Sequence, residues 1–169
     1  MAISMYSASV PVYSHTLANL ERILDKAEAY AAARKFDSAV LLGMRLAPDM
    51  LPLAKQVQIA CDAAKLSVAR LAGIDAPKFE DSEASIADLK ARVRKTIEFL
   101  ATVPAAKVDG SETREVRVPR RDGEMKFDGE TYLKHYALPN FFFHVTTTYA
   151  LLRHNGVELG KADYLGALQ

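Results

Sequence analysis

The sequence predicts an all-α fold: an antiparallel four-helix bundle of one domain over residues 1–169, with a small β-hairpin inserted between the third and fourth helices. Apolar residues recur every three or four positions in four separate stretches, which is the period of one face of an α-helix. Connections of modest length join these stretches, so consecutive helices can bury their apolar faces against one another. A length of 169 residues supplies one core and is too short for two.

The first helix is predicted from apolar residues at alternating spacings of three and four positions. These residues are Tyr6, Val10, Tyr13, Leu17, Leu20, Leu24 and Ala27. Pro11 lies inside the pattern, and proline lacks the backbone donor that a helix interior needs. We therefore expect this helix either to be kinked in its first turns or to begin near Ser9.

The second helix is predicted to begin at a cap formed by Asp37 or Ser38 and to end at Gly73. Its later part carries an apolar face made of Val57, Cys61, Ala64, Val68 and Leu71. Pro48 and Pro52 lie in its middle. Because each proline removes one backbone donor, we expect the helix to bend or break there. Cys61, the lone cysteine, is expected to be an inert packed thiol.

The third helix follows a polar connection over residues 74–83, in which Asp81 and Ser82 are the candidate N-caps. Its apolar face consists of Ile86, Leu89, Val93, Ile97, Leu100 and Val103. Pro104 comes directly after this pattern. Since proline cannot continue a helix, we expect the third helix to end before it.

A β-hairpin is predicted within residues 109–128, where no helical period is found. Two short runs flank Asp122-Gly123, a dipeptide that favours a tight hairpin turn. Asp128 is the expected start of the fourth helix, and Asn155-Gly156 its end, because both residues of that pair tolerate a left-handed backbone.

The balance of charges argues against a nucleic-acid partner. Lys and Arg number 22 against 21 for Asp and Glu, which gives a net charge of +1, whereas nucleic-acid binders show a clear basic excess or face. The first twenty residues contain no Lys or Arg, unlike a secretory signal. No apolar run approaches the roughly 20 residues that span a bilayer. We expect no nucleic acid, no membrane and a cytoplasmic location.

Two stretches of the chain contain its most specific sequence motifs. The first, residues 45–50, reads RLAPDM and is followed by Gln56-Val57; the second, residues 135–157, contains HYALPNFFFH and YALLRHNGV. Both resemble a bacterial and fungal family classified as a domain of unknown function within the DinB/YfiT-like superfamily. The resemblance implies a four-helix bundle, often dimeric, with a pocket at its centre. Many superfamily members hold a divalent metal there with three histidines, and some are thiol-dependent transferases.

The resemblance also implies where metal ligands would lie. Two of the superfamily's histidines form a His-x-x-x-His pair shortly before a Leu-Arg-x-x-Gly ending, and that alignment places His144 on the second histidine and Asn140 on the first. The third histidine comes from the second helix, which has none here; Asp49 is the nearest candidate. The three-histidine set is therefore missing, and a mixed divalent-metal site of His144, Asp49 and Asn140, with His135 as a further candidate, is what remains.

Structural roles compete with these functional ones. His144 is alternatively a core histidine, hydrogen-bonded to Asn140, Asp49 or a tyrosine hydroxyl. Arg45 pairs with Asp49 four residues on, or binds an anionic ligand. Tyr149 and Tyr136 are candidates to offer their hydroxyls to the pocket. Because Phe141, Phe142 and Phe143 cover more than half of a helix circumference, one of them must face away from the core, towards the hairpin or a second subunit.

Two hypotheses about function follow. In the first, the protein is a small-molecule-binding protein or degenerate metal-dependent enzyme, whose polar pocket holds a ligand between the second helix and the fourth. In the second, it is a non-catalytic homodimeric helical module whose polar cluster only fixes the packing. The first expects His144, Asp49 and Asn140 to converge on an open cavity, and the second expects them to be sealed and bonded to one another.

Overall fold

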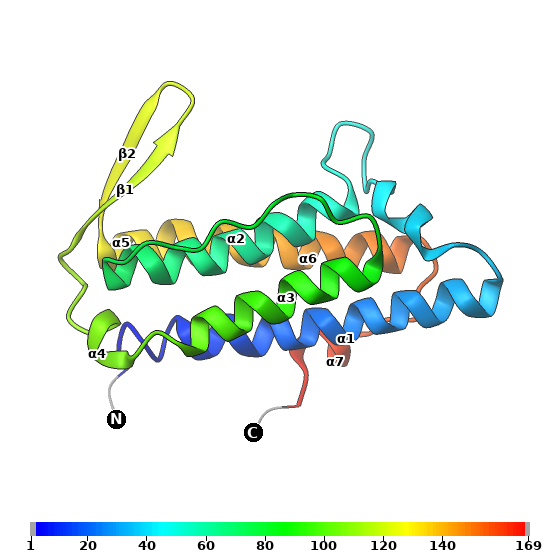
Figure 1. Cartoon of the computed structure of the whole chain (residues 1–169), viewed down its shortest axis with the longest axis horizontal. Helices are drawn as coiled ribbons and strands as arrows, with labels where there is room; N and C mark the ends of the chain where they lie inside the picture. Colours follow the sequence, from blue (N-terminus) through cyan, green and yellow to red (C-terminus); the bar gives the residue numbers. More distant parts are fainter. Residues whose placement is uncertain (1–2, 168–169) are drawn as a thin grey trace.

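The computed structural model describes residues 3–167, which are largely helical with one small antiparallel sheet. The long helices α1 (Val10–Arg34), α2 (Leu53–Ala72), α3 (Ile86–Ala101) and α6 (Leu138–His154) lie side by side. Helix α2 packs against both α3 and α6, and α1 packs against α3. The colour gradient of Figure 1 shows that α1 and α6 run in one direction while α2 and α3 run in the other. The antiparallel prediction is therefore wrong for the neighbours α2 and α3, because the connection between them is long enough to return along the helices.

Helix α1 begins where the sequence predicts, because Ser9 is its N-cap and Pro11 lies in its first turn. Proline is tolerated there, since the first turn has no use for its missing donor. The predicted apolar face is buried from Val10 to Ala27, while Tyr6 precedes the helix. Lys35 ends α1 with a left-handed backbone, at φ 59°.

The prediction of the second helix is wrong for the first half of that helix. Asp37 does act as an N-cap, by accepting a hydrogen bond from the Ala39 amide at 2.9 Å. The element that it caps is only the short 3₁₀ helix η1 (Ser38–Gly43). Residues 44–52 are irregular, and α2 begins at Leu53, directly after Pro52. A proline disfavours the α region for the residue before it and removes a backbone donor, and the backbone at Pro52 is extended, with a ψ of 167°. The predicted end at Gly73 is confirmed.

The N-cap of α3 lies three residues after Ser82 and four after Asp81, the two predicted caps. Ser85 is the N-cap and accepts a hydrogen bond from the Asp88 amide at 3.1 Å. Asp81 forms ion pairs instead, as described below. The helix ends at Ala101, before Pro104 as expected, and the one-turn helix α4 (Ala105–Val108) follows.

The predicted hairpin is present as β1 (Glu115–Arg120) and β2 (Gly123–Asp128), which pair antiparallel and rise from one end of the helices (Figure 1). Its turn lies one residue earlier than the Asp122-Gly123 dipeptide suggests. Arg120 pairs with Gly123, so the two turn residues are Arg121 and Asp122. Gly123 begins β2 with a φ of 133°, a backbone angle that other residues rarely adopt.

The last long helical segment begins at Asp128, as predicted, and runs without a break through three elements. Asp128 caps it by accepting the Thr131 amide at 2.8 Å. The segment consists of α5 (Gly129–Tyr132), the π-helix η2 (Leu133–Ala137) and α6, which ends at Asn155-Gly156 as expected. The short helix α7 (Lys161–Leu165) then packs against α1.

The connection between α2 and α3 runs back along the helices as a long strap of residues 74–85 (Figure 1). Arg92 of α3, whose side chain is 2% exposed, holds this strap with ion pairs to Asp81 at 3.1 Å and Glu83 at 2.9 Å. The same guanidinium lies 3.1 Å from Asp62 of α2. A buried guanidinium is tolerated only where carboxylates compensate its charge, and here they come from two elements.

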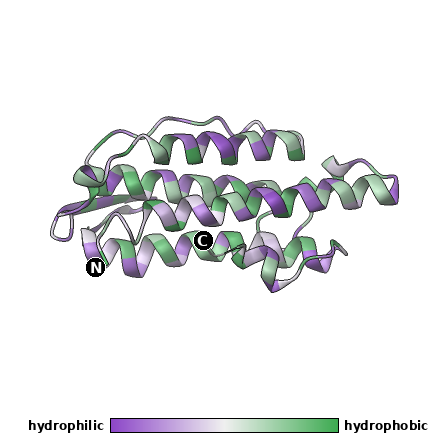
Figure 2. Cartoon of the chain, turned by 90° about the horizontal axis from the view of Figure 1, so that it is seen from below, coloured by the Kyte–Doolittle hydropathy of each residue, from purple (hydrophilic) through white to green (hydrophobic). Residues whose placement is uncertain are grey.

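The surfaces of the long helices mix hydrophobic and hydrophilic residues along their length, as amphipathic helices do (Figure 2). Their apolar faces meet in one buried cluster with contributions from α1, α2, α3 and α6. Cys61 is fully buried in it, and burial raises the pKa of its thiol to about 12, as expected for an inert cysteine. Within residues 3–167, every helix is too short or too polar to cross a membrane.

Replacing Gly129 by alanine is expected to lower the free energy of unfolding by about 1–3 kcal/mol, the usual cost of forcing an extra carbon into a packed site. A Cβ at Gly129 would collide with the backbone oxygen of Ser111, which cannot turn aside as a side chain can. Gly43→Ala is the matched control, because Gly43 is also in a helix and a Cβ there meets nothing within 4 Å. Urea unfolding measures both variants, and equal losses would contradict this packing.

Candidate functional site

His144 of α6 and Gln56 of α2 form the polar centre of the seam between these two helices. His144 is 8% exposed, and its Nδ1 lies 2.8 Å from Gln56 Oε1. The amide nitrogen of Gln56 donates to the Leu51 carbonyl at 3.0 Å, which fixes the amide so that its oxygen faces the imidazole. Because an amide oxygen can only accept, His144 Nδ1 carries the proton in the neutral ring and Nε2 does not.

This arrangement leaves His144 with a basic nitrogen. Burial lowers the pKa of His144 below its usual 6.5, so the ring is neutral at physiological pH. Within the described part of the chain, its hydrogen bond to Gln56 is the one that the ring makes. An unprotonated Nε2 can accept a proton or ligate a metal, and a fixed tautomer is what either role requires.

Asn140, one helical turn before His144, lines a hollow of about 220 Å³. Helix α2 supplies one wall, the segment from Tyr132 to Asn140 supplies the second, and strand β1 supplies the third. The lining residues are Ile59, Asp62, Ala63, Leu66, Arg70, Val118, Pro119, Tyr132, Tyr136, Ala137 and Asn140. The hairpin therefore forms a wall of this hollow through Val118 and Pro119.

Two arginines flank a pair of tyrosines at the hollow. Arg70 Nη1 donates to the Tyr132 hydroxyl oxygen at 3.0 Å, and the rings of Tyr132 and Tyr136 stack with centroids 5.8 Å apart. The guanidinium of Arg120, on the hairpin, lies 5.8 Å from the centroid of the Tyr136 ring. Burial raises the pKa of Tyr132, with Arg70 acting in the opposite direction, so this hydroxyl stays protonated.

The π-helix η2 shapes this wall. Its wider turn lies over Leu133–Ala137, between Tyr132 and Asn140. Single π-turns inside α-helices are frequent at functional sites, because they redirect the side chains on either side. Here Tyr132, Tyr136 and Asn140, spaced four apart, all reach one hollow.

The other residues predicted for the site lie elsewhere. Asp49 and Arg45 are exposed in the irregular segment before α2, and Arg45 donates to the Met50 carbonyl rather than pairing with Asp49. His135 is exposed on η2. Tyr149 is half-buried, and its ring meets that of Tyr164 with centroids 6.0 Å apart. Of the predicted residues, the structure places only Tyr136, Asn140 and His144 along the seam.

The donor set does not fit the three-histidine metal site of the superfamily. Among residues 3–167, no three His, Cys, Asp or Glu side chains gather as a metal would require. His144 Nδ1 is bonded to Gln56, and one imidazole with an amide is a weak set for zinc or nickel.

Sequence reasoning missed Gln56, Arg70 and Tyr132 as site residues. One signal was available, because Tyr132, Tyr136, Asn140 and His144 are spaced every four positions, which indicates polar side chains along one helical face. Nothing in the sequence marks Gln56 as the partner of His144, since the two are 88 positions apart.

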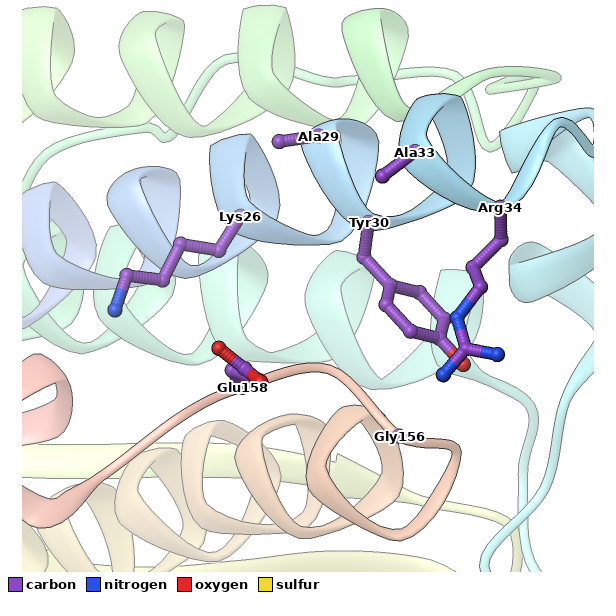
Figure 3. A pocket seen from close by; sticks show the side chains of 7 residues that line it. All are labelled: Lys26, Ala29, Tyr30, Ala33, Arg34, Gly156 and Glu158. Atoms are coloured by element: carbon purple, nitrogen blue, oxygen red, sulfur yellow. The ribbon is translucent and has the colours of Figure 1, made fainter.

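A second hollow, of about 460 Å³, lies between the end of α1 and the segment after α6. Figure 3 shows the side chains of Tyr30 and Arg34 lying together beside Gly156. The Arg34 guanidinium is 5.6 Å from the Tyr30 ring centroid, and Lys26 pairs with Asp163 at 2.7 Å. None of the site residues predicted from the sequence lines this hollow, so it is not the predicted site.

Comparisons with known proteins agree with the resemblance. Residues 5–165 match the family described as Domain of unknown function (DUF1993). The chain is also similar to the crystal structure of a DinB family member protein from Shewanella denitrificans, with 45% sequence identity and a TM-score of 0.91. That match covers 96% of this chain and 92% of the other. Curated proteins offer no match.

The stability of the protein is expected to fall as the pH drops below about 6.5, the usual pKa of an exposed histidine. The folded pKa of His144 is lower than this value, so between the two values the unfolded chain binds a proton that the folded chain does not. Urea unfolding of the wild type and His144→Gln at pH 7.5, 6.5 and 5.5 measures the effect. We expect a shallower pH dependence in the variant, and an identical slope would contradict the buried neutral histidine.

Proposed function

The chain belongs to the DUF1993 family, within the DinB-like superfamily, and we propose that it is a four-helix bundle that binds a small molecule. The proposed site is the hollow between α2, the segment from Tyr132 to Asn140, and the hairpin. A homodimer and a cytoplasmic location remain predictions of the sequence; Phe143, which is 56% exposed, is the candidate subunit contact.

The observation that carries this proposal is the meeting of three elements around one polar-edged cavity. Apolar walls from Ile59, Leu66 and Val118 surround the Asn140 amide and the Arg70 guanidinium. Ligand sites typically combine mostly apolar walls with a few convergent polar groups. The two polar groups here come from different helices, so a ligand that bonds both would be fixed in position and orientation.

Filling the hollow is expected to abolish ligand binding. Ala63 lines it, and a phenylalanine there would occupy the space that a ligand needs. Fragment screening by saturation-transfer NMR, with hits mapped on backbone amide shifts, should give ligands that perturb Ile59 and Asn140 in the wild type and bind at least about tenfold more weakly to Ala63→Phe. Ala33→Phe, in the hollow of Figure 3, is the control and should bind like the wild type. Ligands that bind Ala63→Phe as tightly as the wild type would refute the site.

A metal-dependent reaction is the second candidate, and the unprotonated Nε2 of His144 favours it. Of the ligands predicted from the sequence, His144 and Asn140 lie along the seam and Asp49 does not; Gln56 would orient the imidazole through Nδ1. We derive no reaction step through this set, because it lacks the donors of the three-histidine site.

Metal content tests this second candidate. Because the donor set is weak for zinc and nickel, we expect protein purified without a tag or chelator to carry no stoichiometric metal by mass spectrometry. Added zinc, nickel or manganese should leave its melting temperature unchanged. A near-stoichiometric metal that is lost in His144→Ala would overturn this expectation and establish the metal site.

A further inference from the structure

We propose that the hollow recognises a small organic acid, whose carboxylate is bound by Arg70 and whose apolar body lies between α2, the Tyr132–Tyr136 pair and the hairpin. This inference rests on the proposed small-molecule site and names the chemical class that the site takes. Four features of the described residues support it: the spare donors of Arg70, the position of Arg120, the compensated charge of Asp62, and the size of the hollow.

Arg70 has hydrogen-bonding capacity that the protein does not use. Within residues 3–167 its guanidinium makes no ion pair, and its side-chain hydrogen bond goes to the Tyr132 hydroxyl. A guanidinium carries five N–H donors in a planar fork. This fork fits a carboxylate through two parallel bonds. Because the bond to Tyr132 holds one edge of the guanidinium, the remaining donors are preorganised at the wall of the hollow.

Arg120 adds a second cation at the hairpin. The two glutamates of the hairpin strands pair with other cations: Glu115 lies 2.6 Å from Arg117, and Glu124 lies 3.3 Å from Arg117 and 3.6 Å from Lys126. Among the described residues Arg120 has no acidic partner; its Nε donates to Met125 Sδ at 2.9 Å, and its guanidinium lies over Tyr136. Arg70 and Arg120 thus approach the stacked tyrosines from α2 and from the hairpin, which makes the electrostatic potential there favourable to an anion.

Asp62, the acidic residue that lines the hollow, does not neutralise the positive charge of the two arginines. Its Oδ1 lies 2.9 Å from Lys65 Nζ and 3.1 Å from Arg92 Nη2. Both cations are buried, at 4% and 3% exposed. The charge of Asp62 is therefore committed to the packing of α2 against α3, and the uncompensated charge at the hollow is positive.

The size of the hollow limits the ligand. Its 220 Å³ is below the roughly 300–1,000 Å³ of sites for drug-sized molecules. Ile59, Leu66, Val118 and Pro119 line it with apolar surface, which favours an apolar body over a sugar or a nucleotide. A carboxylate on a single ring or a short aliphatic chain matches this combination of volume, charge and surface.

Benzoate and its neutral isostere benzamide are the probes that test this class. Titrations of the full chain, followed by backbone amide shifts, should show benzoate perturbing α2, η2 and β1. Benzamide should bind about tenfold or more weakly, since hydrogen bonds to a charged group are the stronger ones. Arg70→Gln should remove this preference for benzoate and leave benzamide unchanged. Arg34→Gln, which removes an arginine that lies over a tyrosine ring outside this hollow, should behave as the wild type.

Each other outcome overturns part of the inference. Equal binding of benzoate and benzamide in the hollow would refute the anion class and leave the small-molecule site standing. Tighter, Arg70-dependent binding of phenyl phosphate would replace the carboxylate with a phosphate monoester. If neither probe nor any fragment changes the backbone amide shifts of the residues that line the hollow, both proposals fail. Arg70→Lys serves as the second variant: it keeps the charge without the fork, so it should bind benzoate more weakly than the wild type while retaining the native amide spectrum.

Discussion

The burial of α2 is the constraint on which the rest of the structure depends. This helix packs between α3 and α6, and it also contacts η1, α4 and β1. Most of its residues are therefore inaccessible to water, and Gln56, Gln58, Lys65 and Ser67 are polar residues among them. A buried polar group without a partner costs about 1–3 kcal/mol. Each of these side chains has at least one polar partner, although the Gln58 Oε1 atom itself has none among the described residues.

The partners come from different parts of the fold. Gln56 meets His144 on α6 at 2.8 Å, Ser67 accepts the Tyr13 hydroxyl of α1 at 2.9 Å, and Gln58 donates to Glu83 of the strap at 2.7 Å. Such directional bonds specify the register of each neighbour along α2, which apolar contacts alone would leave looser.

Periodicity predicted the long helices because their apolar faces repeat over several turns, and the start of α1 followed from Pro11. The second helix failed in its first half because a capping residue such as Asp37 marks a helix start without setting its length. That break also explains why Asp49 did not reach the predicted site, since it lies on an exposed segment rather than on a helix beside His144. The alignment of Asn140 with His144 was predictable from spacing, whereas the pairing of His144 with Gln56 depends on how two distant helices pack.

The hollow exists because the two helices are kept from closing on each other at one end. The π-helix η2 directly follows Tyr132 and includes Tyr136, and Val118 of the hairpin lines the hollow together with these tyrosines and with residues of α2. The hairpin in turn is positioned by the close approach of Gly129 to the Ser111 backbone. Arg70 lies near the C-terminal end of α2, beside this hollow. Its guanidinium donates a hydrogen bond to the Tyr132 hydroxyl on one side and faces the hollow on the other. The packing that pairs most of the buried polar side chains of α2 thus leaves, at this end, a guanidinium with unused N–H donors.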